Sequence, residues 1–112
     1  MKQTALERYK IMWIIVLFDL PTNTPKERKQ ATTFRKDLIR DGFYMLQYSV
    51  YIRSFPSREA MNVHVKRIRK ILPTDGQITI MTITDKQYAD ILNYFGRKTE
   101  PLQAAPEQLE MF

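Results

Sequence analysis

The stretch Ile11–Leu20 (IMWIIVLFDL) decides the fold. It is a continuous run of β-branched, aromatic and aliphatic residues that contains one charged residue, Asp19, and is followed at once by Pro21. A run of this length is too short for a buried helix with ordinary caps, whereas a buried strand is commonly continuous in apolar residues. We therefore predict a central strand that is covered on both faces.

The first helix is predicted shortly after this strand. Thr24 precedes Pro25, and Glu27 lies three residues after Thr24, so the segment supplies an N-cap, a proline at the first helical position and a carboxylate in the first turn. We expect this helix to end near Asp41, where Gly42 suits its C-terminal cap. The face predicted to be buried holds Ala31, Phe34 and Leu38.

The segment Phe43–Phe55 (FYMLQYSVYIRSF) is predicted to be extended. It is rich in aromatic and β-branched residues, its second half alternates at the period of a strand, and Pro56 ends it. Two interpretations remain open. The segment is either one long bent strand or two strands hinged near Gln47–Ser49.

The second half of the chain is predicted to form a helix, a strand and a further short helix. Ser57 begins the helix, whose apolar stripe comprises Met61, Val65, Ile68 and Leu72. Gln77–Thr84 (QITIMTIT) is the strand, and Asp85–Phe95 is the short helix, closed by Gly96. The remainder is loop-like, apart from a weak alternation in Gln108–Phe112 (QLEMF) that predicts an added strand.

The order of these elements predicts the fold class. If Phe43–Phe55 supplies two strands, the order is βαββαβ, an α+β ferredoxin-like arrangement with both main helices on one face of an antiparallel sheet. We expect residues 1–10 to be a short leader, 11–96 the ferredoxin-like domain and 97–112 a C-terminal extension. Tyr44, Tyr48 and Tyr51 are predicted on the open sheet face, which a second protomer or a nucleic acid should then cover.

Composition narrows the class of protein. A chain of 112 residues makes one domain, and it contains no cysteine, which excludes disulfides and thiolate metal sites. No apolar span of ~20 residues is present, so no transmembrane helix is predicted and we expect a cytoplasmic protein. The net charge of +6 favours a polyanionic partner.

Basic residues concentrate on the two predicted helices and could follow a phosphate backbone, which gives affinity without sequence preference. A solvated helix face is the alternative interpretation. The candidate nucleic-acid-binding residues are Lys26, Arg28, Lys29, Arg35, Lys36, Arg53, Arg58, Lys66, Arg67, Arg69 and Lys70.

Asp19 is the candidate catalytic and metal-binding residue, because a carboxylate that ends an apolar strand can bind Mg²⁺, a cation that takes oxygen ligands. A turn-capping role before Pro21 is the alternative. One carboxylate alone is a poor metal site. A two-fold axis that brings together Asp19 of two protomers would supply a second carboxylate, and metal-assisted phosphodiester cleavage would then be conceivable. His64, the only histidine, is predicted to be structural or on the surface.

Several segments together resemble the CRISPR-associated protein two family, the small adaptation subunit, in the version from systems with a single large effector nuclease. The matching segments are Met12–Pro21 (MWIIVLFDLP), Phe34–Val50 (FRKDLIRDGFYMLQYSV), Tyr51–Arg53 (YIR), Arg58–Pro73, Ile83–Tyr88 (ITDKQY) and Gln108–Phe112 (QLEMF). They run in the order of the family and cover nearly the whole chain. Phe18 precedes Asp19 where many relatives carry a tyrosine, which puts the hydrolytic role more in question than the fold.

The resemblance implies a homodimer whose sheets face one another, a divalent metal at Asp19, and either RNase or DNase activity. It also implies a bridge between two integrase dimers that holds duplex DNA captured from invaders, with the effector nuclease as a further candidate partner. Three hypotheses therefore stay open: a duplex-DNA scaffold in spacer acquisition, a Mg²⁺-dependent endonuclease acting on single-stranded RNA or duplex DNA, and a non-catalytic RNA-binding module. The residues predicted to contact the integrase or the partner protomer are Leu109, Met111 and Phe112.

Overall fold

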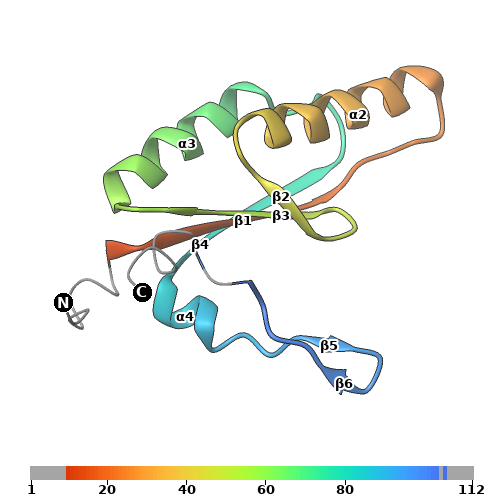
Figure 1. The fold of residues 1–112 in the computed structure, drawn as a ribbon. Helices are drawn as coiled ribbons and strands as arrows, with labels where there is room; N and C mark the ends of the chain where they lie inside the picture. Colours follow the sequence, from red (N-terminus) through yellow and green to blue (C-terminus); the bar gives the residue numbers. More distant parts are fainter. Residues whose placement is uncertain (1–9, 104, 106–112) are drawn as a thin grey trace.

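The computed structural model describes residues 10–103 and residue 105, and Figure 1 shows their arrangement. The elements in chain order are β1 (Met12–Asp19), α2 (Pro25–Arg40), β2 (Tyr44–Gln47), β3 (Val50–Phe55), α3 (Arg58–Lys70), β4 (Gln77–Thr84), α4 (Asp85–Ala89), β5 (Tyr94–Phe95) and β6 (Lys98–Thr99).

The main sheet has the strand order β2-β3-β1-β4, and every neighbouring pair is antiparallel. Helices α2 and α3 lie on one face of this sheet, whereas α4 and the β5–β6 hairpin lie on the other side (Figure 1). The predicted ferredoxin-like α+β arrangement is confirmed. Phe43–Phe55 forms two strands, joined by a two-residue turn at Tyr48–Ser49.

The predicted N-caps hold both helices in place. The Thr24 hydroxyl accepts the Glu27 N–H at 3.1 Å, and the Glu27 carboxylate accepts the Thr24 N–H in return, which completes a capping box. The Ser57 hydroxyl accepts the Ala60 N–H at the start of α3 in the same way. These contacts satisfy helix N–H groups that have no partner within the helix.

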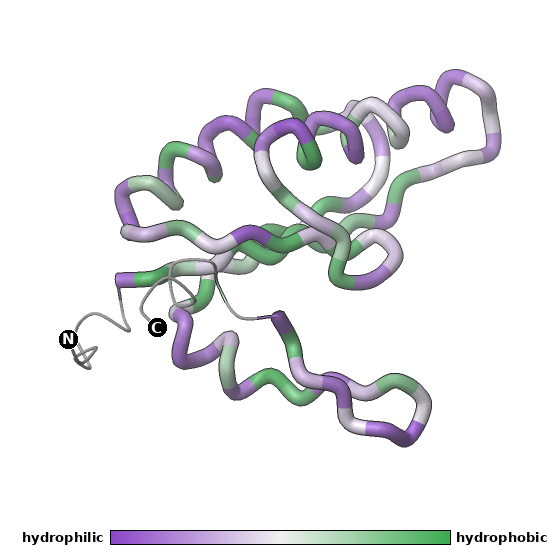
Figure 2. The backbone as a smooth tube through the Cα atoms, viewed as in Figure 1, coloured by the Kyte–Doolittle hydropathy of each residue, from purple (hydrophilic) through white to green (hydrophobic). Residues whose placement is uncertain are grey.

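The main core lies between the sheet and the two long helices. Alternate residues of β1 point toward the helices, as the period of a strand requires, and Figure 2 shows the apolar strands beneath helices of alternating hydropathy. The buried side chains of this core include Met12, Ile14, Val16, Phe18, Phe34, Leu38, Met61 and Ile68. Leu72 was expected in the stripe of the second helix, but α3 ends at Lys70 and Leu72 is 46% exposed in the loop that follows.

The opposite face of the sheet, here called the open face, is covered at one end by α4. The Trp13 indole stacks on the Tyr88 ring with centroids 3.7 Å apart, and its N–H donates to Asp85 at 2.8 Å. The Tyr88 hydroxyl donates to the Gln103 carbonyl, and burial raises the pKa of Tyr88 well above its usual range. Toward Asp19 this face is barer, because Met81 is 44% exposed.

Two predictions about the end of the chain are wrong. The helix that begins at Asp85 ends at Ala89, and Tyr94–Phe95 pairs with Lys98–Thr99 as a hairpin. Gly96 therefore lies in the hairpin turn, at a φ of 66°, and does not cap a helix. Aromatic residues next to a glycine at positive φ favour a hairpin over a helix of this length.

The prediction that three tyrosines share the open face is also wrong. Tyr51 pairs with Val16 across the sheet, and both side chains lie in the core beneath the helices. Tyr48 is 81% exposed in the β2–β3 turn at the rim of the open face, so Tyr44 alone of the three packs on that face.

The predicted strand Gln108–Phe112 lies outside the described residues. Within the described ranges, no helix has the length and hydropathy that crossing a membrane requires.

Candidate nucleic-acid and metal site

Three segments meet at Asp19, the exposed last residue of β1. The Phe18 N–H donates to the Ser49 carbonyl at 3.1 Å, which fastens the β2–β3 turn beside it, and Gln77 at the start of β4 is the cross-strand partner of Asp19. Together they border a shallow hollow of about 330 Å³ at the bare end of the open face. Its lining includes Leu17, Asp19, Tyr48, Ser49, Gln77 and Thr79.

The backbone around this hollow depends on one glycine. Gly76 has a φ of 95°, and a Cβ atom placed on it would lie 2.7 Å from the Asp19 carbonyl oxygen. A contact that short does not occur between real atoms of this kind, so the loop before β4 approaches the end of β1 closely only because residue 76 has no side chain. Gly76 thereby sets the position of the Asp19 backbone.

The oxygen atoms that border the hollow can bind a hard cation only as part of a larger set of ligands. Asp19 supplies one carboxylate, and Ser49 and Gln77 supply neutral oxygens nearby. Among the described residues, no group of three or more His, Cys, Asp or Glu side chains is placed to hold a metal ion. Mg²⁺ is commonly bound through one or two carboxylates, with water and substrate phosphates completing the shell. These donors therefore fit Mg²⁺ only when further oxygens come from water, substrate or a second copy.

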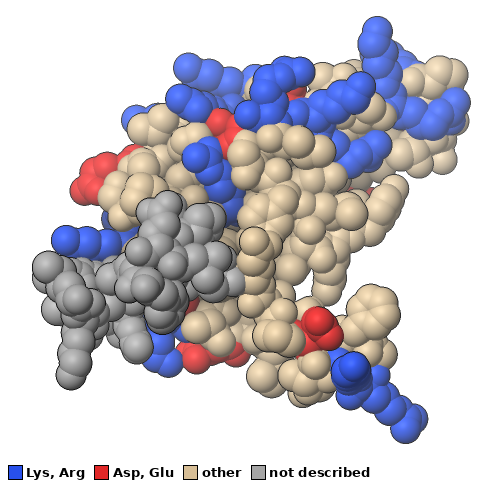
Figure 3. Space-filling view, in the orientation of Figure 1, with Lys and Arg blue, Asp and Glu red and all other residues tan. Residues whose placement is uncertain are grey.

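The basic side chains gather on the opposite side of the molecule, over α2 and α3 (Figure 3). Most of the predicted nucleic-acid-binding residues are exposed there. Of these predicted residues, the ones that are exposed and make no side-chain hydrogen bond or ion pair within residues 10–103 are Lys26, Lys29, Lys36, Arg58, Lys66, Arg69 and Lys70. We call these seven residues the basic layer. Of the other candidates, Arg28 donates to the Thr22 carbonyl and Arg35 to the Thr32 hydroxyl.

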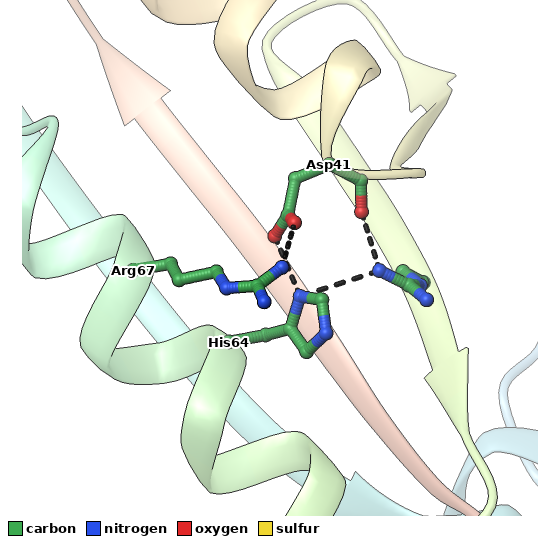
Figure 4. Close-up of polar contacts among 4 residues, drawn as sticks. Asp41, His64 and Arg67 are labelled. Atoms are coloured by element: carbon green, nitrogen blue, oxygen red, sulfur yellow. Dashed lines mark hydrogen bonds and ion pairs between the residues drawn. The ribbon is translucent and has the colours of Figure 1, made fainter.

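Arg53 and Arg67 differ from the basic layer because Asp41 engages both (Figure 4). Arg67 Nη1 lies 3.0 Å from Asp41 Oδ1, and Arg53 donates to the Asp41 carbonyl. Arg53 also stacks over the Phe55 ring, with its guanidinium carbon 4.7 Å from the centroid. Arg53 therefore points into the fold from β3, and Asp41 offsets the charge of Arg67.

His64 completes this cluster and links α3 to the end of α2. Its Nδ1 lies 2.7 Å from Asp41 Oδ2 and 3.2 Å from Arg53 Nη1. A carboxylate can only accept, so Nδ1 carries the hydrogen and donates to Asp41, and the Arg53 contact is then a close approach without a hydrogen bond. Sequence reasoning did not pair His64 with Asp41, because 23 residues separate them and no local spacing signals the contact.

Comparisons with known proteins agree on one family. The family model described as CRISPR associated protein Cas2 matches residues 12–91. A protein of Parvibaculum lavamentivorans named CRISPR-associated endoribonuclease Cas2 is 50% identical over 101 residues, which is 90% of this chain and 100% of that protein. A protein of the same name from Flavobacterium psychrophilum is 50% identical over 109 residues, 97% of this chain and 95% of the relative.

A solved structure titled "Crystal structure of cas2" is similar in fold. The TM-score is 0.55 at 20% sequence identity, and the match covers 83% of this chain and 95% of that one. Identity this low makes the likeness one of fold alone.

The close approach at Gly76 can be tested against a matched glycine. Gly76→Ala and Gly96→Ala both place a side chain at positive φ, but only the first meets backbone atoms, since nothing lies within 4 Å of a Cβ on Gly96. We expect Gly96→Ala to lower the free energy of unfolding by about 1 kcal/mol and Gly76→Ala by about 2–4 kcal/mol. Urea denaturation of both variants measures the difference. Equal losses would show that the approach to Asp19 does not need glycine.

Proposed function

Because the chain belongs to the Cas2 family of CRISPR-associated proteins, we propose that it is the adaptation subunit of its system. In this role it is a homodimer that binds the duplex DNA of captured spacers and bridges integrase dimers. The observation that carries the proposal is the basic layer, which gathers unpaired cations on one side of the molecule. Contacts from lysine and arginine to phosphates fix a protein on a duplex without reading its sequence, which suits a duplex held by its backbone.

Spacing along α3 supports contact with phosphates. Lys66 and Lys70 are four residues apart and therefore lie on one face of the helix, with Arg69 beside them. All three are exposed and free of carboxylate partners among residues 10–103. Captured DNA varies in sequence, so a protein that holds it must bind the backbone common to every duplex.

The homodimer is supported by apolar side chains that are exposed on the side of the open face. Met81, the cross-strand partner of Ile15, is 44% exposed there. On the same side, Leu92, which precedes the β5–β6 hairpin, is 76% exposed, and Phe95 within the hairpin is 82% exposed. Apolar surface of this extent on a small domain favours association, and two copies that face each other through their sheets would cover it.

A second candidate function is a Mg²⁺-dependent endonuclease that acts on single-stranded RNA or duplex DNA. Relatives carry the name endoribonuclease, and Asp19 borders a hollow with neutral oxygen donors. In a dimer with facing sheets, the Asp19 carboxylates of two copies would lie on the shared side and could hold one cation together. The metal, when bound, would generate hydroxide and neutralise the phosphate.

The third hypothesis, a plain RNA-binding module, is weaker. It needs a row of aromatics on an exposed sheet face, but Tyr51 is buried under the helices and Tyr44 packs near Tyr88. We propose that the integrase subunit is the main protein partner, with the effector nuclease as a further candidate, and that the complex works in the cytoplasm. Leu109, Met111 and Phe112 are proposed to contact the integrase or the partner protomer.

Duplex binding is expected to be independent of sequence and to weaken steeply with salt, by about 0.9 in log–log slope for each phosphate contacted. Charge reversal at Lys66 and Lys70 together should lower the affinity about tenfold or more and reduce the salt slope by about two. Reversal of Arg97 and Lys98, which are exposed on the hairpin, makes the same change in net charge and is the matched control. Fluorescence anisotropy with labelled duplex measures both. Equal loss in the two variants would mean that net charge alone, and not the basic layer, binds DNA.

Sedimentation equilibrium at micromolar concentration is expected to find a dimer. Met81→Lys, on the open face, should weaken association, whereas Leu72→Lys should leave it unchanged, because Leu72 is exposed to a similar extent (46% against 44%) but follows α3. A buried lysine without a partner makes an apolar interface unfavourable. A monomeric wild-type protein, or identical behaviour of the two variants, would contradict the proposed interface.

Asp19→Asn tests the endonuclease. The substitution keeps the size of the side chain and removes its charge, so cleavage in Mg²⁺ should fall about a hundredfold or more while duplex affinity persists. Asp90→Asn, which alters an exposed carboxylate at the end of α4, is the control and should cleave as the wild type does. Labelled RNA and duplex DNA are followed by gel electrophoresis. If wild-type protein cleaves neither, or if Asp19→Asn cleaves as well as Asp90→Asn, the endonuclease hypothesis fails and the scaffold proposal stands.

A further inference from the structure

The β2–β3 turn carries residues that a hairpin of this length does not favour. Two-residue hairpin turns prefer asparagine and glycine, because their residues adopt positive φ at little cost. Here the turn consists of Tyr48 and Ser49, and Ser49 has a φ of 65°. It is the one residue other than glycine at positive φ among those described. Strain of this kind is found where the surrounding structure enforces it, often at functional sites.

The surroundings that enforce it are those of the candidate site. The Ser49 carbonyl accepts the Phe18 N–H at 3.1 Å, so the strained residue is bonded to the backbone immediately before Asp19. Tyr48 and Ser49 both line the hollow that Asp19 borders. The turn is therefore fixed in place relative to the carboxylate.

The exposure of Tyr48 is also unusual for an aromatic residue. Its side chain is 81% exposed, although it belongs to the aromatic residues that normally pack. Among the described residues, Tyr48 makes no aromatic ring contact and no side-chain hydrogen bond. A large, exposed aromatic side chain at the rim of a hollow has the form of a stacking platform.

We propose that Tyr48 and Ser49 position one unpaired nucleotide of a nucleic-acid strand beside Asp19, with the Tyr48 ring stacked on the base. The inference rests on the proposed nucleic-acid function and assigns it a second subsite, away from the basic layer. The chemistry of the hollow matches: Leu17 and Val50 give an apolar floor, and Gln77 and Thr79 offer polar groups to a base edge or a sugar.

The occupant must be unpaired. Bases inside a duplex stack on one another, and the terminal pairs of a blunt duplex, although they expose their outer faces, keep both bases paired. A base of a single-stranded end or loop can instead leave the stack and enter a hollow by itself. The Asp19 carboxylate also repels a bare phosphate, so the base and sugar are the parts that the hollow itself takes. A blunt duplex should therefore make no use of Tyr48.

The test compares two DNA probes, a blunt duplex and the same duplex with a single-stranded overhang, by fluorescence anisotropy in a chelator so that no metal contributes. Tyr48→Leu should weaken binding of the overhang probe about five- to a hundredfold, the range of one base–aromatic stack. It should leave blunt-duplex affinity unchanged. Tyr48→Phe keeps the ring and should bind as the wild type does. Leu72→Ala, which shortens an exposed apolar side chain in the loop after α3, is the control and should have no effect on either probe.

Ser49→Gly distinguishes a role in positioning the nucleotide from a role in stability alone. Glycine relieves the positive φ, so thermal unfolding should shift to higher temperature, while affinity for the overhang probe should fall because the turn is less firmly held. The inference is overturned if Tyr48→Leu binds the overhang probe as well as wild type, or if it loses the same factor on both probes. If the wild-type protein does not bind the blunt duplex, the scaffold proposal is overturned instead. The comparison of Tyr48 variants on the overhang probe would still test whether Tyr48 stacks on an unpaired base.

Discussion

Burial of β1 on both faces is the constraint on which the rest of the structure depends. The strand lies between β3 and β4, and its residues alternate between the core beneath α2 and α3 and the core beneath α4. Every side chain from Met12 to Phe18 is therefore apolar, and the polar chemistry of this strand is confined to its end. Asp19 is the first position at which β1 leaves both layers, so the strand that organises the fold also delivers a carboxylate to the surface.

The elements with strong local sequence signals were predicted correctly. The predictions failed where contacts between distant parts of the chain determine which face of the sheet a side chain occupies. The bounds of α2 and β4 follow from a capping box and from a short run rich in β-branched residues after the turn at Pro73–Gly76, and both were predicted correctly. The face of Tyr51 was not, because the β2–β3 hinge and the register with Val16 set it, and neither is a local property. At the candidate site, the position of Asp19 was readable from the end of an apolar run. The support from Ser49 and Gly76 was not, since each contacts Asp19 or its neighbour from a remote part of the chain.

The two candidate functions occupy different sides of the molecule. The basic layer covers α2 and α3, whereas the hollow at Asp19 opens on the other face of the sheet, which the sheet itself separates from the helices. A duplex held by the basic layer would leave Asp19 free, and loss of the carboxylate would leave the basic layer intact. Scaffolding and cleavage would then be independent of one another in this fold, and a family could retain one while the other decays.

The contact between Trp13 and α4 allows intrinsic tryptophan fluorescence to report on the position of α4. The protein contains a single tryptophan, which stacks on Tyr88 and donates to Asp85 in a buried setting. Indole emission depends on the polarity around the ring, and both neighbours of Trp13 come from α4. Any partner that lifts α4 from the open face would expose the indole to water and shift its emission to longer wavelength, whereas a partner that docks on the helices would leave the spectrum as it is. Intrinsic fluorescence can therefore report, without any label, which side of the sheet a binding partner has engaged.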